Sequence, residues 1–492
     1  SVVKKGALAS ILKETKGHYP APLKALESVF FGLKNGIASG LKEERRLCAE
    51  LVISPECKSL VHVFFVSEES AKLSKPLKED LASARVAVLG GGVMGAGIAA
   101  AMLLSKRKVT VIEPVAQVRD RALEHIRNAA NRKRSLSDSE RSALLNALVV
   151  TDDLNKLADA DFVIEAIIED LNVKREIFAK VEGVVGKDTI IATNTSSLSV
   201  NDLASALTDS SRIIGLHFFN PAERMPLVEI VRAKNTSDRA VLRSAALVSG
   251  AAKFPVIVED VAGFLVNRIL SPYLTEAAAL LAEGYSVSDI DGAAMRFGMP
   301  MGPLRLLDEI GLDIAAKVSS IMVGRYGDRM RGPSYAETLA ALGHLGRKNG
   351  SGFYNHTSEE SVVDPQIRVK LGITAAEKVV TPGSAEITDR LMLAMVNEGI
   401  RCLDEGVAGY PGKEAAAQID LATVMGMGFP PFRGGLIFYA QSLGAKATAQ
   451  RMDSLVKRAG PRFEASEGIR KRAEQGKSFF DSIGTLKPSG AA

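Results

Sequence analysis

One short segment, RVAVLGGGVMGAGIA at residues 85–99, limits the possible folds of this chain more than any other feature. Its apolar start predicts a strand, its glycines Gly90, Gly92 and Gly95 follow the spacing G-x-G-x-x-G, and its end predicts a helix. In such a turn the first glycine allows the tight bend, the second lets backbone N–H groups approach a pyrophosphate, and the third lets helix and strand pack closely. The segment therefore predicts a dinucleotide-binding fold with the phosphates at the helix N-terminus.

The kind of dinucleotide depends on Glu113, which ends the next predicted strand eighteen residues after Gly95. A carboxylate at this place can accept hydrogen bonds from both ribose hydroxyls and would repel a 2′-phosphate, so NAD is favoured over NADP. Val93 and Met94, at the start of the helix, are expected to contact the same cofactor. The alternative is a glycine-rich turn in another α/β protein with an incidental glutamate.

Short apolar runs alternate with helical stretches after this turn. Their continuous apolar character is typical of strands that are buried on both faces of a parallel sheet. The alternation predicts a doubly wound α/β domain of the Rossmann type over residues 84–261. The expected strands are residues 85–90, 108–113, 160–167, 188–193 and 212–219.

The rest of the chain predicts helices. Residues 1–83 contain no strand-turn-helix unit, and no strands are expected after about residue 260. The helical pattern of the second half occurs twice, so we expect two copies of one unit, at residues 262–370 and 371–492. The first sign of the repeat is an equal spacing of glutamate and glycine, from Glu276 to Gly284 and from Glu398 to Gly406. The second is the match between residues 296–303 and the sequence around Gly428 and Pro430.

The two copies are not equivalent in this alignment, which places an insertion near residues 410–412 of the second copy. Phe438 then stands at the position of Asp308, and Arg433 stands at the position of Pro303. The loss of a carboxylate suggests that the second copy is structural and is not a second active site.

Composition limits the remaining possibilities. The chain has 492 residues, which suggests two to four domains, and its net charge of +5 suits anionic small molecules better than nucleic acid. Its three cysteines, Cys48, Cys57 and Cys402, predict neither a disulfide framework nor a metal site. No run is long enough for a membrane span, and neither end resembles a secretory or peroxisomal signal. We expect a cytoplasmic protein, with a peroxisomal one as the alternative.

A histidine and a glutamate predict general-base chemistry. His217 ends a predicted strand, and Glu229 lies twelve residues later in LVEIV, which predicts a returning strand. Two strands joined by that turn would set the carboxylate beside one imidazole nitrogen, where it fixes the tautomer and stabilises the imidazolium. The other nitrogen could then remove a hydroxyl proton, as hydride transfer from an alcohol requires. A purely structural histidine is the alternative.

Two polar segments could complete such a site. Ser196, in TNTSSL, follows a predicted strand and would lie at the carboxyl edge of the sheet, where ligands bind in open α/β folds. Asn267, in GFLVNRI, would lie early in the first helix after the α/β domain. Helix capping by Ser196 and a helix-packing hydrogen bond of Asn267 are the alternatives.

The segments LGGGVMGAGIA, EAIIED, TNTSSL, GLHFFNPAERMPLVEIV, DVAGFLVNRI and FGMPMGPLRLLDEIGLD together resemble the 3-hydroxyacyl-CoA dehydrogenases. The resemblance extends from Arg85 nearly to the end of the chain. The doubled helical unit resembles the dehydrogenase half of multifunctional β-oxidation enzymes, and residues 1–83 resemble the tail of their hydratase/isomerase part. Because the body of that part is missing from this sequence, we expect no hydratase activity.

The resemblance assigns roles to individual residues. It makes His217 the catalytic base and Glu229 its partner, and it makes Ser196 and Asn267 catalytic residues that bind the substrate. It places Asn220 beside the histidine and makes Glu113 the acidic residue that binds the ribose. It places Asn194, Glu169 and Lys174 in the cofactor cleft.

The implied reaction is the NAD-dependent, reversible oxidation of an L-3-hydroxyacyl-CoA to the 3-ketoacyl-CoA. A thiolase is a possible partner. Single-unit relatives dimerise through their helical unit, so a chain with two copies is expected to be a monomer or a weak dimer. The alternatives are an inactive NAD-binding structural protein, such as a lens crystallin that resembles this family, and a lysine-dependent NAD enzyme of the 6-phosphogluconate or UDP-glucose dehydrogenase type.

Overall fold

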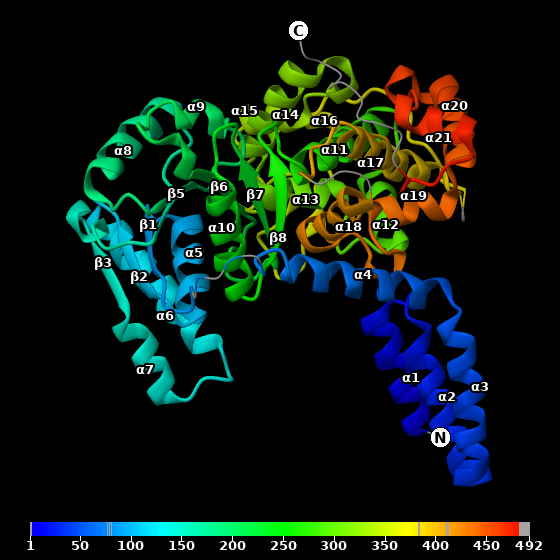
Figure 1. The fold of residues 1–492 in the computed structure, drawn as a ribbon. Coiled ribbons are helices and arrows are strands. Elements are labelled where there is room, and N and C mark those ends of the chain that lie inside the picture. The colour runs from blue at the N-terminus through cyan, green and yellow to red at the C-terminus, as the bar shows by residue number, and fades with distance from the viewer. Residues whose placement is uncertain are drawn as a thin grey trace.

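The protein is described from a computed structural model, which covers residues 2–75, 77, 79, 81–381, 384–409 and 413–481. An α/β part lies on one side of the molecule and a helical part on the other (Figure 1). No helix within the described ranges is both long and apolar enough to cross a membrane.

The α/β part contains one eight-stranded sheet in the order β3-β2-β1-β4-β5-β6-β7-β8. Its neighbouring strands are parallel except for β6 and β7, which are antiparallel because only a short turn joins them. The five expected strands are present, whereas β3 and β8 were not expected. The strands are β1 (Arg85–Leu89), β2 (Lys108–Ile112), β3 (Leu148–Thr151), β4 (Phe162–Glu165), β5 (Ile190–Thr193), β6 (Ile213–Phe218), β7 (Leu227–Arg232) and β8 (Phe254–Glu259).

Helices cover this sheet, and α5 is the one that follows the glycine turn. Nine residues of α5, from Gly95 to Leu103, are buried, because a helix that is apolar on all sides must be enclosed by protein. The helices and short 3-10 turns of this part are α5 (Val93–Leu104), α6 (Ala116–Arg132), α7 (Asp138–Asn146), η1 (Leu154–Leu157), α8 (Leu171–Val184), α9 (Val200–Ala204), η2 (Ser210–Arg212) and α10 (Asp238–Gly250).

The helical part contains two groups of helices that pack on each other. The prediction of helices alone is wrong in one detail, because residues 354–355 and 362–363 form a short hairpin. The first group comprises α11 (Val266–Ala282), α12 (Val287–Phe297), α13 (Pro303–Ile310), α14 (Leu312–Tyr326), η3 (Gly327–Met330), α15 (Tyr335–Ala341), β9 (Tyr354–Asn355), β10 (Val362–Val363) and α16 (Ile367–Lys370). The second comprises α17 (Glu386–Asp404), α18 (Lys413–Met427), η4 (Pro431–Arg433), α19 (Leu436–Leu443), α20 (Ala445–Ala459), η5 (Pro461–Phe463) and α21 (Glu467–Gln475).

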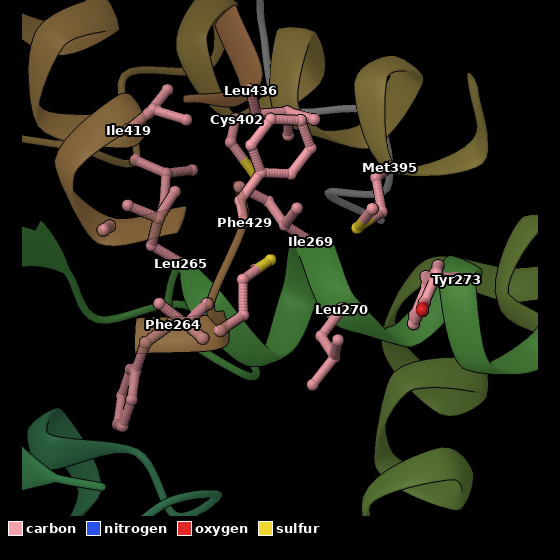
Figure 2. Packing of buried hydrophobic residues seen from close by; sticks show 14 of the residues in the cluster. Phe264, Leu265, Ile269, Leu270, Tyr273, Met395, Cys402, Ile419, Phe429 and Leu436 are labelled. Carbon is pink, nitrogen blue, oxygen red and sulfur yellow. The ribbon is translucent and has the colours of Figure 1, made fainter. Parts of the chain in front are cut away.

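Reciprocal ion pairs relate the two groups as if by a two-fold axis. Arg268 of α11 binds Glu398 of α17 at 2.7 Å, and Arg390 of α17 binds Glu276 of α11 at 2.5 Å. The same exchange of partners is typical of the interface in a symmetric dimer. Apolar side chains from both groups pack around α11, and Figure 2 shows Ile269 of α11 near Cys402 of α17 and Leu436 of α19. The repeat inferred from sequence therefore has a physical counterpart within one chain.

The same capping contact occurs in each group and fixes their alignment. The carboxylate of Asp291 accepts the N–H groups of Leu304 and Arg305 at the start of α13, and that of Asp420 accepts those of Ile437 and Phe438 at the start of α19. A glycine lies against each aspartate, where a β-carbon would clash: Gly302 against Asp291 and Gly435 against Asp420.

This alignment corrects the two replacements expected from the sequence. Pro303 corresponds to Leu436 and not to Arg433, and Asp308 corresponds to Gln441 and not to Phe438. The oxygen of Gln441 accepts the N–H of Phe479 at 2.8 Å, as Asp308 accepts that of Phe353 at 3.0 Å.

The reason for the correction is an insertion that the sequence pattern did not reveal. A β-carbon added to Gly298 would clash with Pro430, and one added to Gly428 would clash with Pro300. The two glycines therefore occupy equivalent places in the two groups, and they lie 130 positions apart in the chain. The next matched pair, Gly302 and Gly435, is 133 positions apart. The three extra residues lie in the segment that forms η4. The insertion expected near residues 410–412 lies outside the described residues.

The N-terminal helices are α1 (Val2–Thr15), α2 (Pro20–Asn35), α3 (Ile37–Val52) and α4 (Pro55–Ala71). The first three project away from the rest of the molecule, whereas α4 lies along it (Figure 1). The Ser70 hydroxyl donates to the carbonyl of Pro255 in β8 at 2.7 Å, and Nε2 of His62 lies 2.9 Å from Asp420. Helix α4 therefore joins the edge of the sheet to the second helical group.

Candidate active site

The predicted histidine and glutamate are in contact. Antiparallel pairing of β6 and β7 sets His217 directly opposite Glu229, and Nδ1 of the imidazole lies 2.6 Å from Oε2 of the carboxylate. Glu229 is fully buried and His217 is only 5% exposed. Since Nδ1 is engaged by the carboxylate, Nε2 is the nitrogen left for a substrate. The twelve-residue spacing in the sequence thus reflects a short hairpin between two paired strands.

The second oxygen of Glu229 binds the start of helix α11. Oε1 accepts the N–H of Leu265 at 3.1 Å and that of Val266 at 2.9 Å. Backbone N–H groups at a helix N-terminus lack partners within the helix, so this contact satisfies two of them and fixes the orientation of the carboxylate. Because Asn267 is the second residue of α11, the same contact fixes its backbone close to the histidine pair.

Asn267 itself is half-buried. The one hydrogen bond of Asn267 that involves a neighbouring side chain uses its backbone carbonyl, which accepts the hydroxyl of Ser271. Within the described part of the chain its side-chain amide makes no hydrogen bond. The helix-packing alternative for Asn267 therefore has no support from its contacts.

Ser196 lies in the loop that follows β5, beside β6. In this loop the oxygen of the Asn194 side chain accepts the N–H of Phe218 at 2.8 Å, which ties the loop to the residue after His217. The N-cap of α9 is Ser199 and not Ser196, so capping is not the role of Ser196. The backbone N–H of Ser196 binds Glu169, and its hydroxyl makes no hydrogen bond within the described ranges.

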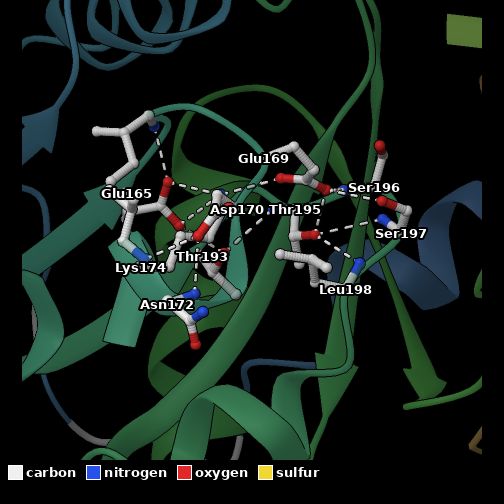
Figure 3. A network of polar contacts seen from close by, with 12 residues as sticks. Glu165, Glu169, Asp170, Asn172, Lys174, Thr193, Thr195, Ser196, Ser197 and Leu198 are labelled. Carbon is white, nitrogen blue, oxygen red and sulfur yellow. Dashed lines mark hydrogen bonds and ion pairs between the residues drawn. The ribbon is translucent and has the colours of Figure 1, made fainter. Parts of the chain in front are cut away.

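Glu169 and Lys174 belong to a polar network beneath this loop (Figure 3). Nζ of Lys174 lies 3.1 Å from Glu169 and 2.7 Å from Glu165, and the lysine is 1% exposed. Burial opposes ionisation of Glu169, but the charge of Lys174 and hydrogen bonds from Thr195, Lys174 and Ser197 outweigh it and hold the pKa of Glu169 below its usual value. The ammonium group of Lys174 is thus occupied by carboxylates, and contact with a cofactor remains a prediction for this residue.

Sequence reasoning missed Glu165. It is the last residue of β4 and is fully buried, with Lys174 and the Thr193 hydroxyl as partners of its carboxylate. An acidic residue that ends an otherwise apolar strand at the carboxyl edge of the sheet was the available signal.

The glycine turn has the shape that a dinucleotide requires. Gly90 has a positive φ of 100°, which other residues rarely adopt, and a β-carbon on Gly95 would lie 2.0 Å from the Gly90 carbonyl. Around Gly92, in contrast, no protein atom lies within 4 Å of an added β-carbon. The first and third glycines therefore close the turn against α5, and the second leaves its backbone accessible to a ligand.

Residues around the turn fit NAD. Glu113 is 8% exposed, and its two oxygens accept the N–H groups of Gly91 and Val115, each at 2.9 Å. A carboxylate with several lone pairs can still accept ribose hydroxyls in this orientation, and it would repel a 2′-phosphate. Val93 is 72% exposed and Met94 is half-buried at the open side of the turn. These features suit a pyrophosphate at the start of α5 and a ribose beside Glu113.

The other expected residues and groups are placed as follows. Asn220 is exposed and takes no part in the hydrogen bonds of the His217 region described above. Two aromatic rings flank the imidazole of His217: Phe219 at 4.5 Å and Phe264 at 5.6 Å between ring centres. Within the described ranges, no group of three or more His, Cys, Asp or Glu side chains could hold a metal ion. The arrangement is that of an imidazole oriented by a carboxylate, at the same carboxyl edge of the sheet as the glycine turn.

Known proteins are similar to this chain in sequence. Residues 85–261 match the NAD-binding domain of 3-hydroxyacyl-CoA dehydrogenases, and residues 263–356 match their C-terminal domain. The chain is 36% identical over 479 residues to a fatty acid oxidation complex subunit alpha of Vibrio campbellii, and 37% identical over 489 residues to that of Shewanella amazonensis. These alignments cover 95% and 96% of this chain, but only 66% and 67% of the relatives, so the chain spans about two thirds of their length.

A solved structure agrees with the sequence matches. The 3-hydroxybutyryl-CoA dehydrogenase of Escherichia coli superposes with a TM-score of 0.69 at 27% identity. The superposition covers 80% of this chain and 98% of that one. The likeness therefore extends beyond the α/β part into the helical groups.

Proposed function

The chain belongs to the 3-hydroxyacyl-CoA dehydrogenase family, and on this premise we propose that it oxidises L-3-hydroxyacyl-CoA to 3-ketoacyl-CoA, reversibly, in fatty-acid β-oxidation. The observation that carries the proposal is the contact of 2.6 Å between Nδ1 of His217 and the buried carboxylate of Glu229. An imidazole oriented in this way, at the same edge of the sheet as a dinucleotide turn, suits proton removal from a hydroxyl group.

His217 acts as the general base in this proposal. NAD, when bound, supplies the acceptor for the hydride that leaves C3 of the substrate. Nε2 of His217 takes the hydroxyl proton, so the C3–O bond becomes a carbonyl. Glu229 stabilises the resulting imidazolium and is itself held in place by the start of α11. In the reverse direction the protonated His217 returns its proton to the forming alkoxide.

Ser196 and Asn267 hold the substrate oxygen and the thioester region. The loop of Ser196 is tied to the residue after His217 through Asn194, and the start of α11 before Asn267 is bound by Glu229. Asn220 lies in the turn between β6 and β7, where we expect its exposed amide to contact the substrate. Orientation of this kind contributes to catalysis because it holds the reacting atoms in a near-attack geometry.

Several wider properties follow from the same family. The related subunits belong to fatty acid oxidation complexes, and a thiolase is the partner that we expect for this chain. The reciprocal contacts between α11 and α17 use internally a surface that a single helical unit would present to a second copy. We therefore expect a dehydrogenase part that is monomeric or weakly associated, in the cytoplasm of its source.

The test is an assay of NADH oxidation with acetoacetyl-CoA and with a long-chain 3-ketoacyl-CoA. Wild type should turn over, and His217→Gln should lose about 10³-fold or more in kcat while it still binds NADH. His125→Gln is the matched control, because His125 is a half-exposed histidine of the same α/β part that contacts Glu223. Equal turnover by wild type and His217→Gln would contradict the assignment, as would an inactive wild type that binds NADH.

A further inference from the structure

Glu165 is a buried charge that the reaction proposed above does not use. It ends β4 at the carboxyl edge of the sheet and has no exposed surface. Oε1 accepts the backbone N–H of Ile167 at 2.7 Å, and Oε2 accepts the hydroxyl of Thr193 at 2.7 Å. Nζ of Lys174 donates to both oxygens, at 2.7 and 2.9 Å. Every partner in this set is a donor, so the site is built for an ionised carboxylate.

Lys174 connects Glu165 to a second carboxylate. Its side chain is 1% exposed, and its ammonium group lies 3.1 Å from Oε2 of Glu169. A buried ammonium must be compensated by opposite charge and hydrogen bonds. Lys174 is therefore bound by both Glu165 and Glu169 (Figure 3).

Glu169 holds the loop that carries Ser196. Its Oε1 accepts the hydroxyl of Thr195 at 2.5 Å, the backbone N–H of Ser196 at 3.1 Å and the hydroxyl of Ser197 at 3.0 Å. The hydroxyl of Thr193, which donates to Glu165, also accepts the N–H of Thr195 at 3.2 Å. The loop is thus bound by both carboxylates, while the Ser196 hydroxyl makes no bond within the described ranges.

We propose that Glu165 is a positioning residue for the dehydrogenase reaction: it holds Lys174, Lys174 holds Glu169, and Glu169 fixes the backbone of Ser196. This inference rests on the function proposed above. A glutamine at this place would present a donor to Lys174 or to Thr193, which are themselves donors. Lys174 would then rely on Glu169 alone and draw its carboxylate away from the loop. Glu165 touches neither substrate nor the reacting atoms in this account.

The experiment compares wild type with Glu165→Gln, Glu165→Asp and the charge-free double variant Glu165→Gln/Lys174→Met. The readouts are kcat/KM for acetoacetyl-CoA at saturating NADH, NADH affinity by fluorescence, and the thermal midpoint Tm. Glu165→Gln should lower kcat/KM about 10- to 100-fold, since misplacement by about 1 Å has effects of this size. Glu165→Asp keeps the charge and should recover part of the loss. Glu182→Gln is the control, because Glu182 lies on α8 and binds backbone N–H groups far from Ser196 in the chain.

The double variant separates positioning from stability. It leaves no buried lysine without Glu165, so its Tm should return toward that of wild type, but its kcat/KM should stay low because no cation holds Glu169. A pH profile adds a second distinction. Lys174 is the charged group in contact with Glu169, and without its charge burial would raise the pKa of Glu169. The double variant, which lacks this lysine, should therefore lose activity at weakly acidic pH, where wild type does not.

Two results would overturn the proposal while the dehydrogenase function stands. One is a Glu165→Gln variant with the kcat/KM of wild type. The other is a double variant in which Tm and kcat/KM recover together, since Glu165 would then only balance a buried charge. An inactive wild type would instead refute the proposed function, and this inference with it.

Discussion

The two helical groups share one framework but differ where they could meet a substrate. Each has an arginine that binds the other's glutamate, and each has a buried aspartate that caps a helix. In the first group, α11 starts at the Glu229 carboxylate and continues with Asn267. Because Arg268 corresponds to Arg390, the residue before each arginine also corresponds. The second group therefore has Asp389 where the first has Asn267. The contacts between helices have thus been kept, whereas the polar groups of the site differ.

The two groups also differ in what completes them. In the first group the Tyr354 hydroxyl donates to Asp291 at 2.8 Å, and Arg305 lies over the tyrosine ring. In the second, His62 from α4 contacts Asp420, and Phe438 stacks on the histidine ring at 4.6 Å between ring centres. Phe438 corresponds to Arg305 in the structural alignment. The second group therefore takes from the N-terminal helices a side chain that the first group supplies itself.

The largest expected effect concerns the reciprocal ion pairs. Arg268→Met and Arg390→Met should each cost about 3 kcal/mol of unfolding free energy, the lower end of the cost of breaking a buried ion pair, because each removes the nearest arginine of a buried glutamate. Arg329 still contacts Glu398 and Arg462 still contacts Glu276 in these variants. Denaturant unfolding measures both. Only Arg268→Met should also lower kcat/KM, since Arg268 follows Asn267 on the helix that begins at Glu229. Equal losses of activity in both variants would show that the groups do not differ in function.

The next largest effect is expected from variants that exchange Asn267 and Asp389, the residues that distinguish the two groups. Asn267→Asp places a second carboxylate near Glu229 and should lower kcat/KM about 10²-fold, or roughly 2–3 kcal/mol in the transition state. Asp389→Asn is the reverse exchange and should leave kcat/KM within about twofold. Burial raises the pKa of Asp389, and its partner Arg451 is 3.5 Å away, so neutralising it removes little. Steady-state kinetics would contradict the comparison if Asp389→Asn were the more damaging change.

A smaller effect concerns the side chains that complete each group. Tyr354→Phe and His62→Leu each remove a donor from a buried aspartate, which should cost about 1–3 kcal/mol in unfolding free energy. His62→Gln can still donate to Asp420 and serves as the control. None of these variants should change the pH dependence of kcat. If His62→Leu left stability unchanged, α4 would not be part of the second group.

The smallest effect is expected at Gln441, which replaces the carboxylate of Asp308. Gln441→Glu keeps an oxygen for the N–H of Phe479. A change at this half-buried position that keeps the acceptor should stay within about 1 kcal/mol. We expect no new activity, because the glycine turn described above precedes α5 in the α/β part. Thermal unfolding and the assay would reveal a larger effect in either direction.

The sequence was sufficient for contacts that depend on local geometry. The pairing of His217 with Glu229 could be predicted because a short hairpin brings two strand residues together. The strands β3 and β8 were missed: β3 has four residues and is half-exposed, and β8 begins with Phe254 and Pro255. The alignment of the helical copies was wrong by three residues because η4 leaves no signal in the spacing of apolar residues.

Contacts between distant segments could not be read from the sequence. Glu165, Lys174 and Glu169 lie close in the chain, but their link to Ser196 depends on the parallel pairing of β4 with β5. The second oxygen of Glu229 reaches the start of α11 only after the helical part has packed against the sheet. The sequence thus indicated which residues to propose for the reaction, whereas the structure shows what holds them.

The most direct test of the central claim is a crystal structure of the complex with NAD and acetoacetyl-CoA. The account predicts Nε2 of His217 within about 2.6–3.2 Å of the 3-keto oxygen, with Nδ1 still bound to Glu229 and Ser196 and Asn267 around the substrate. An imidazole turned away from the bound substrate, or separated from Glu229 in the complex, would contradict it.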